Sequence, residues 1–192
     1  MAYGQLNADT ITGSGASSVI INNGTSNVAG FTTGNNLQML QNGGGIVFSN
    51  SSALTNSTLN DYETGTFTPN LAFGGGSSGM TYSIQTGSYV KIGRLVFVSV
   101  NIQLTALGSS TGASTITNLP FTALSGNAYG AGLSLAYSNG MQYQSGYAMW
   151  ITNGTNVINF NQLGVNGTSV YSQGNFTNSS VFQISGCYYA NA

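Results

Sequence analysis

The chain has 192 residues, of which two are basic, three are acidic and none is histidine. Charged side chains make up 3% of the chain, against about 25% in ordinary soluble domains. General acid–base catalysis requires His, Glu, Asp or Lys in convergent positions, and metal sites require clusters of His, Cys or carboxylates. The composition therefore argues against most enzymes and metalloproteins, and we expect no enzymatic activity and no cofactor.

Charge and hydropathy also argue against two classes of partner. The formal net charge is −1, whereas nucleic-acid binding requires clustered Lys and Arg that neutralise phosphates. No segment approaches the ~18 consecutive apolar residues that a membrane-spanning helix needs. Hydrophobic residues still make up 41% of the chain, which is enough apolar surface to close a core. We expect a folded protein that binds neither nucleic acid nor membrane.

Residues 1–60 are poor in aromatic residues and rich in Asn, Gly, Ser and Thr. Strands of only a few residues are not stable without a partner surface. The pattern predicts an extended N-terminal arm or attachment segment with short β segments, and an ordinary β-meander packed on its own domain is the alternative. The short apolar segments of this region, each bounded by turn residues, lie at 19–21, 28–31, 37–40 and 46–48.

The next region, residues 61–192, contains the clearest strand pattern, at 94–104. Strict alternation of apolar residues is typical of a half-buried strand. The opposite face begins with apolar Leu95 and Phe97 and becomes polar from residue 99 onward, so we expect one end of this strand to be covered on both sides. The residues predicted to share the core face are Val96, Val98, Val100, Ile102 and Leu104.

Further strands follow at short intervals. Asn-Gly pairs at 139–140, 153–154 and 166–167 predict hairpin turns, because both residues tolerate positive φ. This number of short strands predicts an all-β fold, an antiparallel β-sandwich of jelly-roll type, over residues 61–192. In chain order these strands are expected at 65–73, 81–90, 114–118, 129–137, 142–151, 157–163, 170–173 and 181–189.

Three segments carry a resemblance to a known group of proteins. Residues 60–69, NDYETGTFTP, are similar to the DYEEGTWTP opening found in many phage structural proteins. GSYVKIGR at 87–94 and LPF at 119–121 then follow in the order seen in that group. The chain thus resembles phage virion structural proteins with a tail-fibre or decoration-type C-terminal β domain. Its opening, GQLNADTI at 4–11, looks cyanophage-like.

The resemblance implies a virion component on the outer surface of the particle, commonly a homotrimer, in contact with the major capsid protein or another virion protein. We favour a capsid-decorating (cement) protein that stabilises the head shell through its N-terminal arm and a trimeric β knob, because the arm needs a partner surface. The alternative is a small tail or head fibre whose β tip binds a host-surface receptor such as a glycan.

Four of the charged residues lie within these segments: Asp61, Glu63, Lys91 and Arg94. We predict that the acidic pair meets the basic pair across the sheet or across a subunit boundary, because arginine and lysine form charge-assisted hydrogen bonds with carboxylates. Such contacts would fix the strand register. One alternative is that all four are solvated turn residues. A glycosidase pair formed by the two carboxylates is a further alternative, which the absence of any other catalytic feature disfavours.

Aromatic residues offer a second candidate site. Tyr143, Tyr147, Trp150 and Tyr171 are candidates for a receptor-binding or subunit-interface surface, since Tyr and Trp combine an apolar face with a polar group. Trp150 lies in a strand-like run, which favours core or interface positions over a sugar-binding surface. The one cysteine, Cys187, excludes an intrachain disulfide, and its apolar neighbours predict that it is buried.

Overall fold

The structure is a computed structural model that describes residues 61–126, 131–142, 146–164 and 166–191, together with five short strands between residues 20 and 59. The chain divides into two compact units, Met1–Asn60 and Asp61–Ala192. In the described residues no helix is long and apolar enough to cross a membrane.

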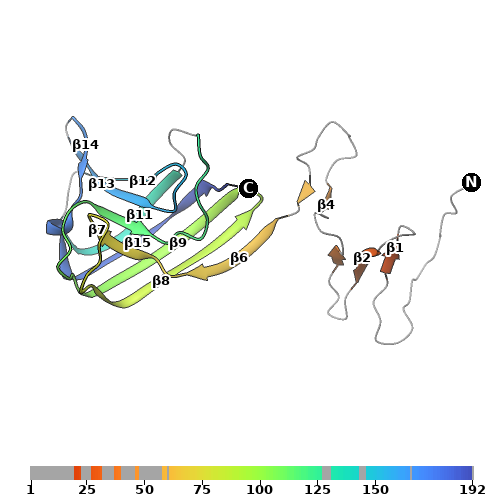
Figure 1. Ribbon diagram of the computed structural model, residues 1–192, viewed down its shortest axis with the longest axis horizontal. Coiled ribbons are helices and arrows are strands. Elements are labelled where there is room, and N and C mark those ends of the chain that lie inside the picture. Colours follow the sequence, from red (N-terminus) through yellow and green to blue (C-terminus); the bar gives the residue numbers. More distant parts are fainter. Residues whose placement is uncertain are drawn as a thin grey trace, which may run out of the picture. The chain divides into compact units, whose positions relative to one another are not determined.

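The first unit contains short antiparallel strands (Figure 1). β1 (Ile20–Asn22), β2 (Asn27–Phe31) and β3 (Leu37–Met39) form one sheet, and β4 (Ile46–Val47) pairs with β5 (Thr58–Leu59). Four of these strands overlap the apolar segments that the sequence singles out. That the unit serves as an arm on a partner surface stays a prediction.

The second unit is a pair of antiparallel sheets (Figure 1). The first sheet has the order β11-β15-β9-β8-β6, and the second has the order β12-β13-β10-β7 with β14 paired to β13. The expected all-β, antiparallel architecture is therefore confirmed. The strands of the first sheet are β6 (Tyr62–Phe67), β8 (Thr81–Ile92), β9 (Leu95–Ala106), β11 (Ala131–Met141) and β15 (Phe176–Tyr189). Those of the second are β7 (Asn70–Phe73), β10 (Ser114–Thr117), β12 (Tyr147–Ile151), β13 (Ile158–Gly164) and β14 (Gly167–Val170).

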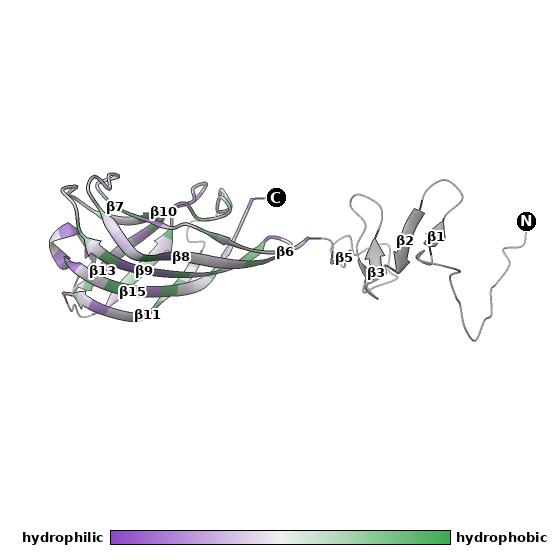
Figure 2. Ribbon diagram, turned by 90° about the horizontal axis from the view of Figure 1, so that it is seen from below, coloured by the Kyte–Doolittle hydropathy of each residue, from purple (hydrophilic) through white to green (hydrophobic). Residues whose placement is uncertain are grey.

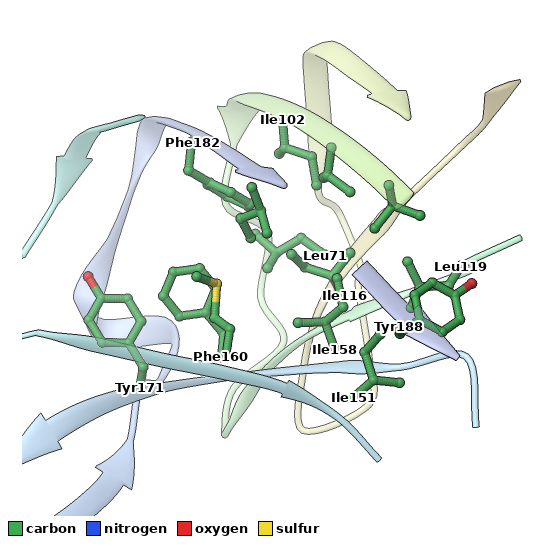
Figure 3. Packing of buried hydrophobic residues seen from close by; sticks show 14 of the residues in the cluster. Leu71, Ile102, Ile116, Leu119, Ile151, Ile158, Phe160, Tyr171, Phe182 and Tyr188 are labelled. Atoms are coloured by element: carbon green, nitrogen blue, oxygen red, sulfur yellow. The ribbon is translucent and has the colours of Figure 1, made fainter. Parts of the chain in front are cut away.

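The core lies between the two sheets (Figure 3). The alternation predicted for β9 is confirmed, because the residues of its predicted core face are all at most 2% exposed. They belong to one cluster with apolar residues of the second sheet, including Leu71, Ile116, Ile158 and Phe160. Hydrophobic and hydrophilic stretches alternate along the strands of the first sheet (Figure 2), as expected when one face is buried and the other is not.

Two strand predictions are wrong for identifiable reasons. The segment 65–73 was expected to be one strand, but β6 and β7 belong to different sheets, and Thr68-Pro69 connects them. Proline lacks the N–H that a strand interior needs, so the chain leaves the first sheet there. The segment 170–173 is also not a strand: β14 ends at Val170, and a 3-10 turn, η1, follows at Gln173–Asn175.

The turn expected at Asn139-Gly140 is instead a bulge within β11. The register with β15 shifts between Asn139 and Met141, and Gly140 has a φ of 68°. Its carbonyl accepts hydrogen bonds from Thr177 Oγ1 at 2.9 Å and Ser180 Oγ at 2.6 Å. Positive φ serves a bulge as well as a hairpin, so the dipeptide alone did not distinguish the two.

The outer side of β9 departs from expectation. Leu95 and Phe97 are 42% and 43% exposed, so the prediction that this end of the strand is covered on both sides is wrong for the single chain. Cys187, opposite Phe97 on β15, is exposed as well. The second sheet packs against the inner face only, and strict alternation therefore directs these three side chains outward.

Candidate functional site

The structure brings Asp61 and Lys91 together at one end of the first sheet. The Lys91 ammonium forms an ion pair with the Asp61 carboxylate. Lys91 is only 8% exposed, since it follows the inward alternation of β8, and its ammonium lies 5.3 Å from the centre of the Phe121 ring. A cation held over an aromatic face beside a carboxylate has both an apolar and an ionic partner.

Glu63 is directly opposite Lys91 in the register of β6 and β8, yet its carboxylate accepts a hydrogen bond from the Tyr89 hydroxyl at 2.5 Å. This hydrogen bond, with smaller contributions from desolvation and the carboxylate charge, raises the pKa of Tyr89. The Tyr89 ring meets the Phe121 ring edge-on, with 5.2 Å between centroids. Phe121 therefore lies between the two polar contacts.

Arg94 is placed differently from the other three charged residues. Its Nε donates to the carbonyl of Ala190 at 3.2 Å, and the Ala190 N–H donates to the Arg94 carbonyl at 2.8 Å. Among the described residues the ion pair present is the one between Lys91 and Asp61. Arg94 thus joins the start of β9 to the end of β15 through backbone contacts.

The two carboxylates are both engaged by protein donors. Asp61 is paired with Lys91, and Glu63 accepts from Tyr89. The backbone carbonyl of Asp61 also accepts from the Gly93 N–H at 2.7 Å. These contacts hold β6 against the end of β8 and the β8–β9 turn, and so they stabilise this end of the sheet. Among the described residues no group of three or more His, Cys, Asp and Glu is placed to hold a metal ion.

Tyr147 and Tyr171 point into the core rather than toward solvent. Their rings lie 5.5 Å apart and both pack against Phe160, at 5.6 and 5.2 Å. The Tyr171 hydroxyl donates to the Gln142 carbonyl at 2.9 Å. Burial, followed by interaction with Tyr147, raises the pKa of Tyr171 far above its ordinary value. Tyr171 is therefore part of the core, and Tyr147 is partly buried and packs against it.

Trp150 lies on the outer side of the second sheet, since its neighbours Met149 and Ile151 face the core. It is half-buried and stands opposite Asn159, which in turn stands beside Thr115. Asn159 Nδ2 donates to Thr152 Oγ1 at 2.6 Å. Tyr143 falls outside the described residues. Of the aromatic candidates that the structure describes, Trp150 alone therefore faces away from the core.

A further group of residues, of which the sequence analysis singled out only Leu95 and Phe97, lies on the outer face of the first sheet. Five large apolar side chains there are 42–66% exposed and come from four adjacent strands. Single exposed apolar residues are ordinary, whereas a contiguous exposed group marks an interaction surface. The five are Tyr62, Ile92, Leu95, Phe97 and Tyr189.

Comparisons with known proteins show a likeness of fold. No protein-family model and no curated protein matches the chain. Among solved structures, the fold is similar to that in the crystal structure of the Dettilon tailspike protein, with a TM-score of 0.56 and 20% sequence identity. The match covers 72% of this chain and 26% of the tailspike chain, so the shared fold spans about a quarter of the length of that chain.

Proposed function

We propose that the chain is a structural component of a phage particle, and that its sandwich is a tail-fibre or tailspike-type module on the outer surface. The observation that carries the proposal is the fold that 72% of this chain shares with part of a tailspike protein. Fold likeness does not by itself transfer function, so the role needs a second line of support.

That support comes from the three segments that resemble phage virion proteins. Asp61, Lys91 and Phe121 each come from a different one of the three, and they meet in the ion pair and the cation–aromatic contact. The three segments that carry the resemblance therefore contact one another in the folded sandwich. Contacts of this kind stabilise the fold, and a stable fold is what a module shared among virion proteins requires.

We further propose that the protein has no enzymatic activity. The charged side chains of the second unit are used to hold strands together, as the contacts of Asp61, Glu63, Lys91 and Arg94 show. Catalysis by general acid and base requires groups that are free to exchange protons with a substrate. Incubation with host surface polysaccharide is expected to release no new reducing ends, and their release would overturn this part of the proposal.

A second candidate is the capsid-decorating (cement) role. The exposed apolar group on the first sheet favours it, because a protein fixed on a shell would have such a surface covered by its neighbours. In that role the first unit, with its short strands, would be the attachment segment.

Labelling of intact particles with an antibody against residues 61–192 distinguishes the two. For the tail-fibre role we expect signal confined to the tail at few copies per particle. Signal spread evenly over the head would support the cement role instead. Absence of the protein from purified particles, measured by mass spectrometry, would overturn both.

A further inference from the structure

The outer face of the first sheet has two halves of different chemistry. At one end, Tyr62 pairs with Ile92, Ile92 with Leu95, and Leu95 with Tyr189, so these side chains form a row across four strands. The next row on the same face holds Val90, Phe97 and Cys187. We call these seven residues the apolar half-face: Tyr62, Val90, Ile92, Leu95, Phe97, Cys187 and Tyr189.

The adjoining half of the same face is polar and uncharged. Ser88, Ser99 and Ser185 form the next row, and Thr86, Asn101 and Gln183 form the one after it. An apolar area that adjoins uncharged polar side chains has the composition of a protein–protein interface, which combines an apolar core with a polar rim. Short serine side chains also allow a second backbone surface to approach closely.

We propose that a second copy of this chain covers the outer face of the first sheet, with the apolar half-face at the centre of the contact. Charge favours a copy over a charged partner. No residue of the apolar half-face or of the two polar rows carries a charge, and the nearby Lys91 is turned inward, where it is paired with Asp61. Two copies with a net charge of −1 each approach without appreciable repulsion.

The area of the outer face also fits a second copy of this chain. The sheet has five strands, and its two longest central strands, β8 and β9, have 12 residues each. With strands about 4.8 Å apart and about 3.4 Å per residue, the face measures about 24 by 40 Å, or roughly 1,000 Å². A stable interface buries about 800 Å² on each partner. Sheets of separate layers commonly pack face to face, about 10 Å apart.

This inference is independent of the proposed virion role, because it rests on the register and exposure of the sheet alone. Its experiment uses the full chain. We expect sedimentation analysis and light scattering to give a multimer that persists at micromolar concentration. The double variant Leu95→Thr, Phe97→Thr removes two central apolar side chains while retaining residues suited to strands, and we expect its multimer dissociation constant to rise by at least about tenfold.

A matched control is available on the same face. Tyr137 on the edge strand β11 is 50% exposed and pairs with Gln183 in the polar half, at the rim of the proposed contact, so Tyr137→Thr is expected to raise the dissociation constant much less than the double variant does. Circular dichroism checks that both variants are folded. Cys187 supplies a second measurement on the wild-type protein, because a neutral maleimide should label it at least about tenfold more slowly in the multimer than in the dissociated chain.

The results of these experiments distinguish this contact from other contacts between copies of the chain. A wild-type chain that is monomeric at all concentrations tested would overturn the proposal. So would a multimer that survives the Leu95/Phe97 change while Cys187 stays freely reactive, since copies would then be joined elsewhere, for example through residues 1–60. A dissociation constant raised much more by the double variant than by Tyr137→Thr, together with protection of Cys187, supports it.

Discussion

Lys91 and Asp61 form an ion pair across the end of the first sheet, and the lysine is nearly buried while the aspartate is about half exposed. The contact joins the residue just before β6 to the end of β8. Because Phe121 also contacts the Lys91 ammonium, the pair anchors the segment after β10 to the same place. A buried charge that loses its partner is strongly destabilising, and this defines the first prediction.

Asp61→Asn is expected to lower the free energy of unfolding by about 1–2 kcal/mol, because it leaves a nearly buried ammonium without its countercharge, while the exposure of Asp61 moderates the cost. Urea denaturation measures the change. Glu63→Gln serves as the control and should cost less than about 1 kcal/mol, since the amide oxygen still accepts from Tyr89.

The double variant Asp61→Asn, Lys91→Met tests whether the loss arises from the charge. Methionine fills the space over Phe121 without requiring a countercharge, so we expect it to recover most of the stability that Asp61→Asn removes. If the two changes are simply additive, the ion pair contributes nothing and the interpretation is wrong.

Gly186→Ala is expected to destabilise the sandwich by about 1–3 kcal/mol. A methyl group at Gly186 would lie 2.2 Å from the Gly132 carbonyl oxygen, which is backbone and cannot move aside. Gly132→Ala on the neighbouring strand is the control, because nothing lies within 4 Å of its added carbon. Thermal unfolding should separate the two variants, and equal midpoints would contradict the predicted clash.

Phe160→Ala is expected to cost about 3–5 kcal/mol. Phe160 is fully buried and packs against Tyr147, Tyr171, Phe176 and Phe182 at centroid distances of 5.2–6.1 Å. Leu163→Ala on the same strand is the control: Leu163 is largely exposed, and surface changes usually stay within about 0.5 kcal/mol. Comparable losses in urea denaturation would mean that the core is not centred on Phe160.

The sequence predicts the core face of β9 because alternation is a local property of a single strand. It also suggests that acidic and basic segments meet, and the structure places Asp61 against Lys91. Arg94 is different, since its partner is the backbone carbonyl of Ala190, and no sequence pattern marks a carbonyl. The division of 65–73 into β6 and β7 depends on which sheet each half joins, and Pro69 was the available signal.

The apolar half-face could not be predicted from the sequence, for a related reason. Tyr62, Leu95 and Tyr189 are distant in the chain, and they become neighbours only through the register of β6, β8, β9 and β15. From the sequence, Leu95 and Phe97 indicated a covered surface. The pattern gives no means to distinguish a cover supplied by the same chain from one supplied by another molecule.

Trp150 provides a test of the host-glycan alternative. It is the single tryptophan of the chain, and it stands in one row with Asn159 and Thr115 on the outer side of the second sheet. Sugars stack on aromatic faces while amides and hydroxyls bind their hydroxyl groups. If the sandwich binds a host glycan there, adding host surface polysaccharide should change Trp150 fluorescence saturably. An unchanged spectrum during demonstrated adsorption would place the receptor contact elsewhere.

Alkaline pH is expected to unfold the protein cooperatively, because the pKa values of several tyrosines are raised. Burial raises the pKa of Tyr188 to about 12, although the hydrogen bond that its hydroxyl oxygen accepts from the Phe121 N–H partly opposes the shift. Burial also raises the pKa of Tyr82 and of Tyr171. A group that holds its proton more tightly when folded stabilises the fold below its unfolded pKa of about 10, and that stability is lost as pH rises through the folded pKa.

The sign of the effect is therefore fixed: the free energy of unfolding should fall between about pH 10 and pH 12. Between pH 5 and 8 it should be nearly flat, because the chain has no histidine, the side chain that ordinarily titrates there. Urea denaturation across the pH series measures both regions.

Tyr188→Phe is the variant that tests whether Tyr188 contributes to this loss. It loses the hydrogen bond to Phe121 and about 1 kcal/mol at neutral pH, but it removes one alkaline titration, so the gap to the wild type should narrow above pH 10. A gap that stays constant would mean that Tyr188 ionises as readily in the folded chain as in the unfolded one.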